Sequence, residues 1–270
     1  MKSKAVSLPY IIWMIAFTII PLGMIVFFAF TTDNGNFTLD NISQIGQYMS
    51  IFLLSFKLAI IATVFCLLLG YPLAYLMSRA KPVSQRTMVM LLMLPMWMNF
   101  LLRTYAWMTI LENNGLLNRF FGLFGLGPFK MINTEGAVIL GMVYNYLPFM
   151  VLPLYTIMMK IDPSVIEAAQ DLGANAFHVF ARVIVPLSLP GIISGITMVF
   201  VPSVSTFIIS KMLGGGSNML IGDLIQEQFI GGSYNPRLGS AMSLILMVVI
   251  LIVMGVVNRL DDEDKEGLLV

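Results

Sequence analysis

Residues 162–173 read DPSVIEAAQDLG, a short polar stretch that separates two long apolar runs of the sequence. Either Asp162 or Ser164 can cap the start of a helix, and Pro163 suits a first helical turn. Gly173 stands where such a helix would end, because glycine adopts the conformation of a helix C-terminus at little cost. The stretch therefore predicts a short water-facing helix between segments that prefer an apolar environment.

A second helix is expected to follow the first one directly. Ser164 and Glu167 have the spacing of a capping box, which would strengthen the start of the first helix. Asn175 can cap the second helix, and Pro186 then allows the next apolar run to begin. From these signals we predict a compact helical hairpin, residues 160–186, that projects from the rest of the protein.

The composition of the chain excludes a water-soluble protein. Of its 270 residues, 58% are hydrophobic and only 11% are charged, whereas soluble domains carry about 25% charged residues. The net charge of +1 excludes nucleic-acid binding driven by overall basicity. A single cysteine and a single histidine argue against a disulfide framework and against a multi-histidine metal site. We expect an all-α integral membrane protein with no metal and no cofactor in this chain.

Six apolar stretches are long enough to cross a bilayer, whose core of about 30 Å needs around 20 residues per helix. The predicted spans cover approximately residues 8–30, 51–77, 88–111, 137–159, 187–210 and 240–257. No connection between them is long enough for a separate folded domain, so we expect a single transmembrane domain over residues 1–270. Two prolines, Pro190 and Pro202, are expected to break the fifth span.

The distribution of Lys and Arg predicts the orientation. These residues are more numerous in the segments that lie inside when both termini are inside. The chain is therefore expected to be a multi-pass protein of the cytoplasmic membrane with N-in and C-in topology, and the hairpin then faces the cytosol. None of the six spans carries Asp or Glu in its apolar interior, so a proton relay is hard to build. Either the energy comes from elsewhere or the protein is not a pump.

The hairpin resembles the EAA loop of binding-protein-dependent ABC importer permeases. The resemblance rests on Glu167–Ala169, on Gly173, and on the V-x-V-P of residues 183–186, where the family pattern has I-x-L-P. It implies a type I ABC importer permease architecture, in which this loop is a coupling helix that docks on a cytosolic ATPase. The docking contact would then be carried by Ser164, Glu167, Ala168, Ala169, Asp171 and Gly173.

Other segments resemble the spermidine/putrescine-type permeases of that family, and their order resembles the PotB-type subunit more than its PotC-type sibling. They are LGYP at 69–72, LPMW at 94–97, LRTYAW at 102–107, LPF at 147–149, GGG at 214–216, LIG at 220–222 and QEQF at 226–229. The resemblance implies a heterodimer with a sibling permease, an ABC ATPase dimer and an extracytoplasmic substrate-binding protein. The chain has no G-x-x-x-x-G-K-[ST] loop, so we expect ATP to bind the partner and this subunit to be non-catalytic.

A polyamine substrate would need groups that attract ammonium, through aromatic faces or carboxylates. Arg103 either anchors the third span at the interface or faces a polar cavity, and Ser203 and Ser205 either satisfy backbone carbonyls or line a water-filled path. The candidate substrate path comprises Trp97, Arg103, Tyr105, Trp107, Tyr144, Asn145, Tyr146, Ser203, Ser205, Asp223 and Glu227.

Three alternatives stay open at this point. An ABC permease for another small solute would share every feature of the hairpin. A self-contained channel or secondary carrier would transport without an ATPase. A membrane-embedded enzyme is a third class, but the lone Cys66 and the lone His178 fall in different segments, so the sequence reveals no nucleophile–base pair.

Overall fold

The structure, a computed structural model, describes residues 3–216 and 218–267. Within those ranges all regular structure is helical, apart from one isolated bridge between Thr31 and Phe37. Five helices are long and apolar enough to cross a membrane, and a bent pair of helices makes a sixth crossing when it is counted as one span. The prediction of six spans is thus confirmed, with a change in the third.

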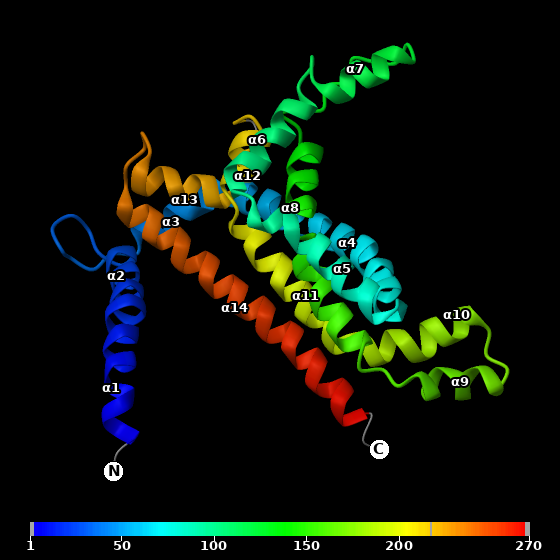
Figure 1. The fold of residues 1–270 in the computed structure, drawn as a ribbon. Helices are drawn as coiled ribbons and strands as arrows, with labels where there is room; N and C mark the ends of the chain where they lie inside the picture. The colour runs from blue at the N-terminus through cyan, green and yellow to red at the C-terminus, as the bar shows by residue number, and fades with distance from the viewer. Residues whose placement is uncertain (1–2, 217, 268–270) are drawn as a thin grey trace.

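The helices form a bundle in which segments far apart in the chain, such as α2 and α14, lie side by side (Figure 1). They are α1 (Ser3–Met14), η1 (Ile15–Ile19), α2 (Ile20–Ala29), α3 (Asp40–Ser43), η2 (Gln44–Tyr48), α4 (Met49–Arg79), α5 (Pro82–Met93), η3 (Leu94–Trp97), α6 (Phe100–Leu111), α7 (Leu116–Leu123), α8 (Glu135–Met158), α9 (Pro163–Asp171), α10 (Ala176–Val179), η4 (Phe180–Ile184), α11 (Val185–Ser205), α12 (Ile208–Leu213), α13 (Ile221–Ile230) and α14 (Pro236–Gly267).

The centre of the bundle is formed by α4, α8 and α11, which pack closely along their lengths (Figure 1). Small residues allow this approach, because in a membrane helices associate through packing rather than through the hydrophobic effect. A Cβ on Gly195 would come within 2.6 Å of the Met150 sulfur, and one on Gly191 within 3.2 Å of the Leu154 Cα. These two glycines therefore allow α11 to pack closely against α8.

The third span is broken, where the sequence predicted one continuous helix over 88–111. Two helical segments, Pro82–Trp97 and Phe100–Leu123, meet at a bend of 88°. Met98 has an extended backbone, and the Asn99 side chain then caps α6 by accepting the N–H groups of Leu101 and Leu102. A capping asparagine placed after a proline turn starts a new helix more readily than it continues the old one.

The fifth span is continuous, where the sequence predicted breaks at Pro190 and Pro202. Both prolines lie inside α11, which ends only at Ser205. The second helix of the hairpin also runs into this span without a break, so one helix covers Ala176–Ser205. The π-helical turn η4 ends at Ile184, and Pro186 then lies in the first turn of α11, a position that tolerates proline.

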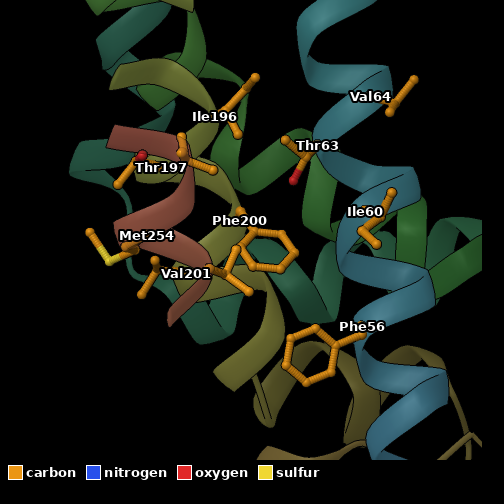
Figure 2. Close-up of a pocket in the computed structure, with 11 residues that line it drawn as sticks. Phe56, Ile60, Thr63, Val64, Ile196, Thr197, Phe200, Val201 and Met254 are labelled. Atoms are coloured by element: carbon orange, nitrogen blue, oxygen red, sulfur yellow. The ribbon is translucent and has the colours of Figure 1, made fainter. Parts of the chain in front are cut away.

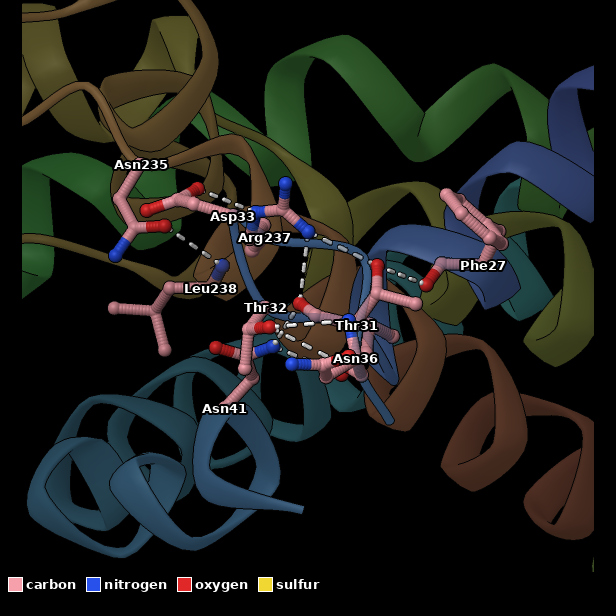
Figure 3. A network of polar contacts seen from close by, with 10 residues as sticks. Phe27, Thr31, Thr32, Asp33, Asn36, Asn41, Asn235, Arg237 and Leu238 are labelled. Atoms are coloured by element: carbon pink, nitrogen blue, oxygen red, sulfur yellow. Dashed lines mark hydrogen bonds and ion pairs between the residues drawn. The ribbon is translucent and has the colours of Figure 1, made fainter. Parts of the chain in front are cut away.

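The first span stands apart from the bundle and contacts mainly α14 (Figure 1). A polar network at one end joins them, in which Arg237 of α14 meets the loop after α2 (Figure 3). Arg237 donates to the Thr31 carbonyl at 2.9 Å, to the Thr31 hydroxyl at 3.0 Å and to Asp33 at 2.7 Å. The Asp33 side chain is 96% exposed, so the contacts to Thr31 carry more of the attachment than the ion pair does.

We expect Arg237→Ala to destabilise the protein by about 1.5–3 kcal/mol, because it removes charge-assisted donors from the buried Thr31. Asp33→Ala is the matched control and should cost at most about 0.5 kcal/mol, because the ion pair it removes is exposed. Denaturation of the two variants in the same detergent measures the difference. Equal losses for both variants would contradict this ranking.

Candidate functional site

The hairpin begins as the sequence predicted, with one correction. Asp162 is the N-cap of α9, its carboxylate accepts the Ser164 N–H at 2.9 Å, and Pro163 is the first helical residue. This hydrogen bond lowers the pKa of the Asp162 carboxyl. The capping box predicted for Ser164 and Glu167 is wrong, because it requires Ser164 itself at the N-cap position.

The turn between the two hairpin helices is a Schellman motif centred on Gly173. Gly173 has φ +85°, its N–H donates to the Gln170 carbonyl at 2.9 Å, and the Ala174 N–H donates to the Ala169 carbonyl at 3.1 Å. Asn175 then caps α10 by accepting the His178 N–H at 2.9 Å. The helix-ending role predicted for Gly173 and the capping role predicted for Asn175 are therefore confirmed, and these contacts set the angle of α9 to the long helix that follows.

The surface of this hairpin is open to a partner. Ser164, Glu167, Ala168, Asp171 and Gly173 are exposed, whereas Ala169 is half-buried against the hydrophobic core. Apolar side chains lie beside them without cover: Val165 is 44% exposed, Leu172 is 89% exposed and Phe177 is 73% exposed. The hairpin projects from one end of the bundle (Figure 1). Exposed apolar side chains on a rigid projection are typical of a docking surface.

The aromatic residues proposed for the substrate path do not form one lining. Trp107 and Tyr144 contact each other edge to face with their ring centres 5.4 Å apart. Tyr146 is buried and donates to the Pro202 carbonyl at 3.3 Å. Trp97 and Tyr105 lie on the surface of the bent third span, where they are 73% and 55% exposed.

Most of the polar side chains proposed for the path donate hydrogen bonds to backbone carbonyls. The Ser203 and Ser205 hydroxyls donate to the carbonyls of Val199 and Val201 in the preceding turn, at 2.6 and 3.1 Å. Of the two roles considered for these serines, hydrogen bonding to backbone carbonyls fits the geometry, rather than lining a water-filled path. Arg103 is buried and donates to the Pro95 carbonyl at 2.8 Å, so it braces the bend of the third span.

Asn145 differs from the two serines. Its side-chain nitrogen donates to the Gly141 carbonyl at 2.8 Å, while its oxygen is buried with no hydrogen-bond partner. A buried amide oxygen without a donor is costly, so this position suits a contact with a further polar group.

Asp223 and Glu227, by contrast, are brought together at one cavity. The cavity has a volume of about 120 Å³, and its lining also includes Ser210, Lys211 and Gln226. Sequence reasoning missed Lys211 and Gln226 as neighbours of this cavity. The spacing of residues 223, 226 and 227 could have shown that α13 presents its polar side chains on one face.

The Asp223 carboxylate is 6% exposed and only half satisfied. One oxygen, Oδ2, accepts the Leu220 N–H at 2.9 Å at the start of α13, while Oδ1 is buried with no partner. Burial raises the pKa of Asp223, and the nearby Ser210 hydroxyl, the Leu220 N–H and the Lys211 charge act in the opposite direction. Asp223 is therefore buried inside the protein rather than presented to solvent.

A larger cavity of about 340 Å³ lies between α4, α11 and α14, but its lining is apolar (Figure 2). Phe56, Phe200 and Met254 contribute to it. Thr63 also lines it, but its hydroxyl donates a hydrogen bond to the Ala59 carbonyl at 2.7 Å. Among the residues that the structure describes, no charged side chain lines it. A cationic solute would find no counter-charge there, so this cavity fits hydrocarbon rather than the transported solute.

Comparison with known proteins identifies the same kind of family that the hairpin resembles. Residues 66–263 match the model of the family described as "Binding-protein-dependent transport system inner membrane component". A spermidine/putrescine transport system permease protein PotB from Haemophilus influenzae is 39% identical over 257 residues, covering 92% of this chain and 90% of that protein. The protein of the same name from Escherichia coli is 38% identical over 88% of this chain and 90% of that protein.

Solved structures share the fold at low sequence identity. A chain of a bacterial ABC transporter involved in the import of the acidic polysaccharide alginate superposes with a TM-score of 0.77 at 18% identity, covering 96% of this chain and 94% of that chain. A chain of the MetNI methionine ABC transporter gives a TM-score of 0.58 at 16% identity, covering 80% of this chain and 95% of that one. The apolar spans, the EAA-type hairpin and the relatives lead to one conclusion: this chain is a multi-pass membrane protein that belongs to the family of inner membrane components of binding-protein-dependent transport systems.

Proposed function

We propose that this chain is the non-catalytic permease subunit of an ATP-driven importer for polyamines of the spermidine and putrescine class. The observation that carries the proposal is the exposed α9 hairpin, which presents Glu167 and uncovered apolar side chains at one end of the bundle. The substrate class is supported by the names of relatives that are 38–39% identical over about nine tenths of the chain.

The partners follow from this role. A cytosolic ABC ATPase dimer would bind the hairpin. A sibling permease would form a heterodimer with this chain and complete the substrate path, and an extracytoplasmic binding protein would deliver the substrate. The start of α1 and the end of α14 lie at the same end of the bundle as α9 (Figure 1). This arrangement supports an N-in, C-in topology in the cytoplasmic membrane, in which both termini and the hairpin share the cytosolic side.

The mechanism we infer is alternating access driven by the ATPase. The helix Ala176–Ser205 has 30 residues, and at 1.5 Å per residue it spans about 45 Å. It connects the hairpin directly to α12 and α13 at the other end of the bundle, so a displacement of α9 moves the far end as part of one rigid body. ATP is needed because a solute that binds both conformations equally shifts neither population.

Reconstitution tests this proposal. Proteoliposomes that hold the permease pair and the ATPase, with the binding protein outside and ATP inside, should accumulate radiolabelled spermidine or putrescine. Omission of the ATPase should abolish accumulation, whereas a channel or secondary carrier would still transport. Accumulation of another solute in place of both polyamines would favour the alternative of an ABC permease for a different small molecule.

A further inference from the structure

We propose that the cavity between α12 and α13 binds one terminal primary ammonium group of the transported amine, with Asp223 as its principal ligand. The identity of the amine rests on the proposed function, whereas the ammonium site itself rests on the residues that line the cavity.

The first observation is the orphaned oxygen of Asp223. Oδ2 accepts the Leu220 N–H, which leaves Oδ1 buried without a hydrogen-bond partner, and the residue Asp223 lines the cavity. An unpaired buried carboxylate oxygen is costly, so a site of this kind calls for a donor or a cation. An alkylammonium supplies both, because its three N–H groups carry a positive charge.

The neighbouring side chains suit the remaining donors of an ammonium group. Glu227 offers a second carboxylate and Gln226 an amide oxygen, both from α13 and one turn from Asp223. The Ser210 hydroxyl donates to the Phe207 carbonyl at 3.0 Å, and its oxygen keeps lone pairs that can accept. Each donor of an ammonium placed here would therefore have an acceptor of its own.

The charge of the lining leaves room for one monovalent cation. The lining holds two acidic side chains, Asp223 and Glu227, and one basic side chain, Lys211, so its formal charge is −1. Lys211 is exposed, and among the described residues it forms no ion pair with either carboxylate. The net charge of the lining is thus negative, and the Asp223 oxygen is not already neutralised by this lysine.

The volume limits what can enter. A space of about 120 Å³ holds an ammonium head and a short piece of its methylene stem, but not a whole triamine. The cavity therefore fits one end of a linear polyamine. Its helices, α12 and α13, lie at the end of the bundle opposite to α9 (Figure 1), which is the side where a delivered substrate would enter under the proposed topology.

A labelling experiment tests the site without relying on transport. A cysteine is placed in the lining by Gln226→Cys in the assembled complex, and its reaction rates with cationic aminoethyl and anionic sulfonatoethyl methanethiosulfonate are compared. The chain's own cysteine, Cys66, is fully buried, and the unsubstituted complex gives the background. Tyr234→Cys, at a side chain that is 70% exposed, gives the intrinsic ratio of the two reagents.

We expect the lining cysteine to prefer the cationic reagent roughly tenfold over that intrinsic ratio, as one charge-assisted contact would produce. Added Asp223→Asn should remove the preference, and propylamine or spermidine should slow the labelling. A ratio equal to that at Tyr234→Cys, or a preference that survives Asp223→Asn, would overturn the proposal.

Uptake by the reconstituted complex then links the site to transport. Asp223→Asn retains a carbonyl oxygen that can accept the Leu220 N–H, so the helix cap survives while the charge is lost. We expect spermidine uptake to fall roughly tenfold or more, while Glu112→Gln, which removes an exposed carboxylate elsewhere, should leave uptake unchanged. Uptake by Asp223→Asn within twofold of wild type would refute the site. Wild-type complex that labels as expected yet accumulates no polyamine would refute the proposed function alone.

Discussion

Gly173→Val is expected to abolish most ATP-driven uptake while the permease still assembles. Gly173 has φ +85°, a conformation that costs an L-residue about 1–2 kcal/mol and a β-branched one more. A Cβ at this position meets nothing within 4 Å, so the core is not disturbed. This conformational penalty disfavours the turn that sets the angle between α9 and α10. Each 1.4 kcal/mol by which the docked geometry is disfavoured weakens binding of the hairpin to the ATPase about tenfold.

Gly173→Asn is the matched control, because asparagine tolerates the left-handed conformation far better than valine does. It should retain most of the uptake. Uptake and substrate-stimulated ATP hydrolysis of the reconstituted complexes measure coupling, and size-exclusion chromatography of the complexes measures assembly. If Gly173→Val transports as well as wild type, the hairpin is not the element through which the ATPase acts.

Gly222→Ala should produce the largest loss of stability among single-atom additions to this chain's helices. A Cβ on Gly222 would lie 2.5 Å from the carbonyl oxygens of Ser205 and Thr206. Both are backbone atoms at the end of α11, so no side chain can turn away to relieve the clash. Overpacking typically costs about 1–3 kcal/mol, and with no flexible neighbour we expect about 3 kcal/mol, or roughly 6–12 °C in Tm.

Gly232→Ala provides the comparison, because a Cβ there meets nothing within 4 Å and the backbone is not in the left-handed region. Its Tm should stay within about 1–2 °C of wild type, as for an ordinary surface substitution. Thermal unfolding of both variants in one detergent decides the matter. An unchanged Tm for Gly222→Ala would show that α13 does not pack on α11 as closely as described.

The location of the spans and of the hairpin could be predicted because both depend on neighbouring residues in the chain. Membrane crossing requires a run of about 20 apolar residues, and capping requires a side chain within two or three positions of the N–H it accepts. Asp162, Gly173 and Asn175 each act over such short distances. The predicted breaks at Pro190 and Pro202 were wrong because they were inferred from the prolines alone. Whether a proline breaks a helix depends on how the surrounding helix adjusts.

The sequence by itself determined that the chain crosses a membrane and carries an EAA-type hairpin, since apolar runs and helix caps depend only on residues that are close together in the sequence. Only the tertiary structure decided the continuity of Ala176–Ser205 and the surroundings of Asp223. The start of α13 is fixed by the Ile221 N–H, which donates to the Ser55 hydroxyl of α4 at 2.8 Å across 166 residues of sequence. No local pattern encodes a contact between helices so far apart in the chain.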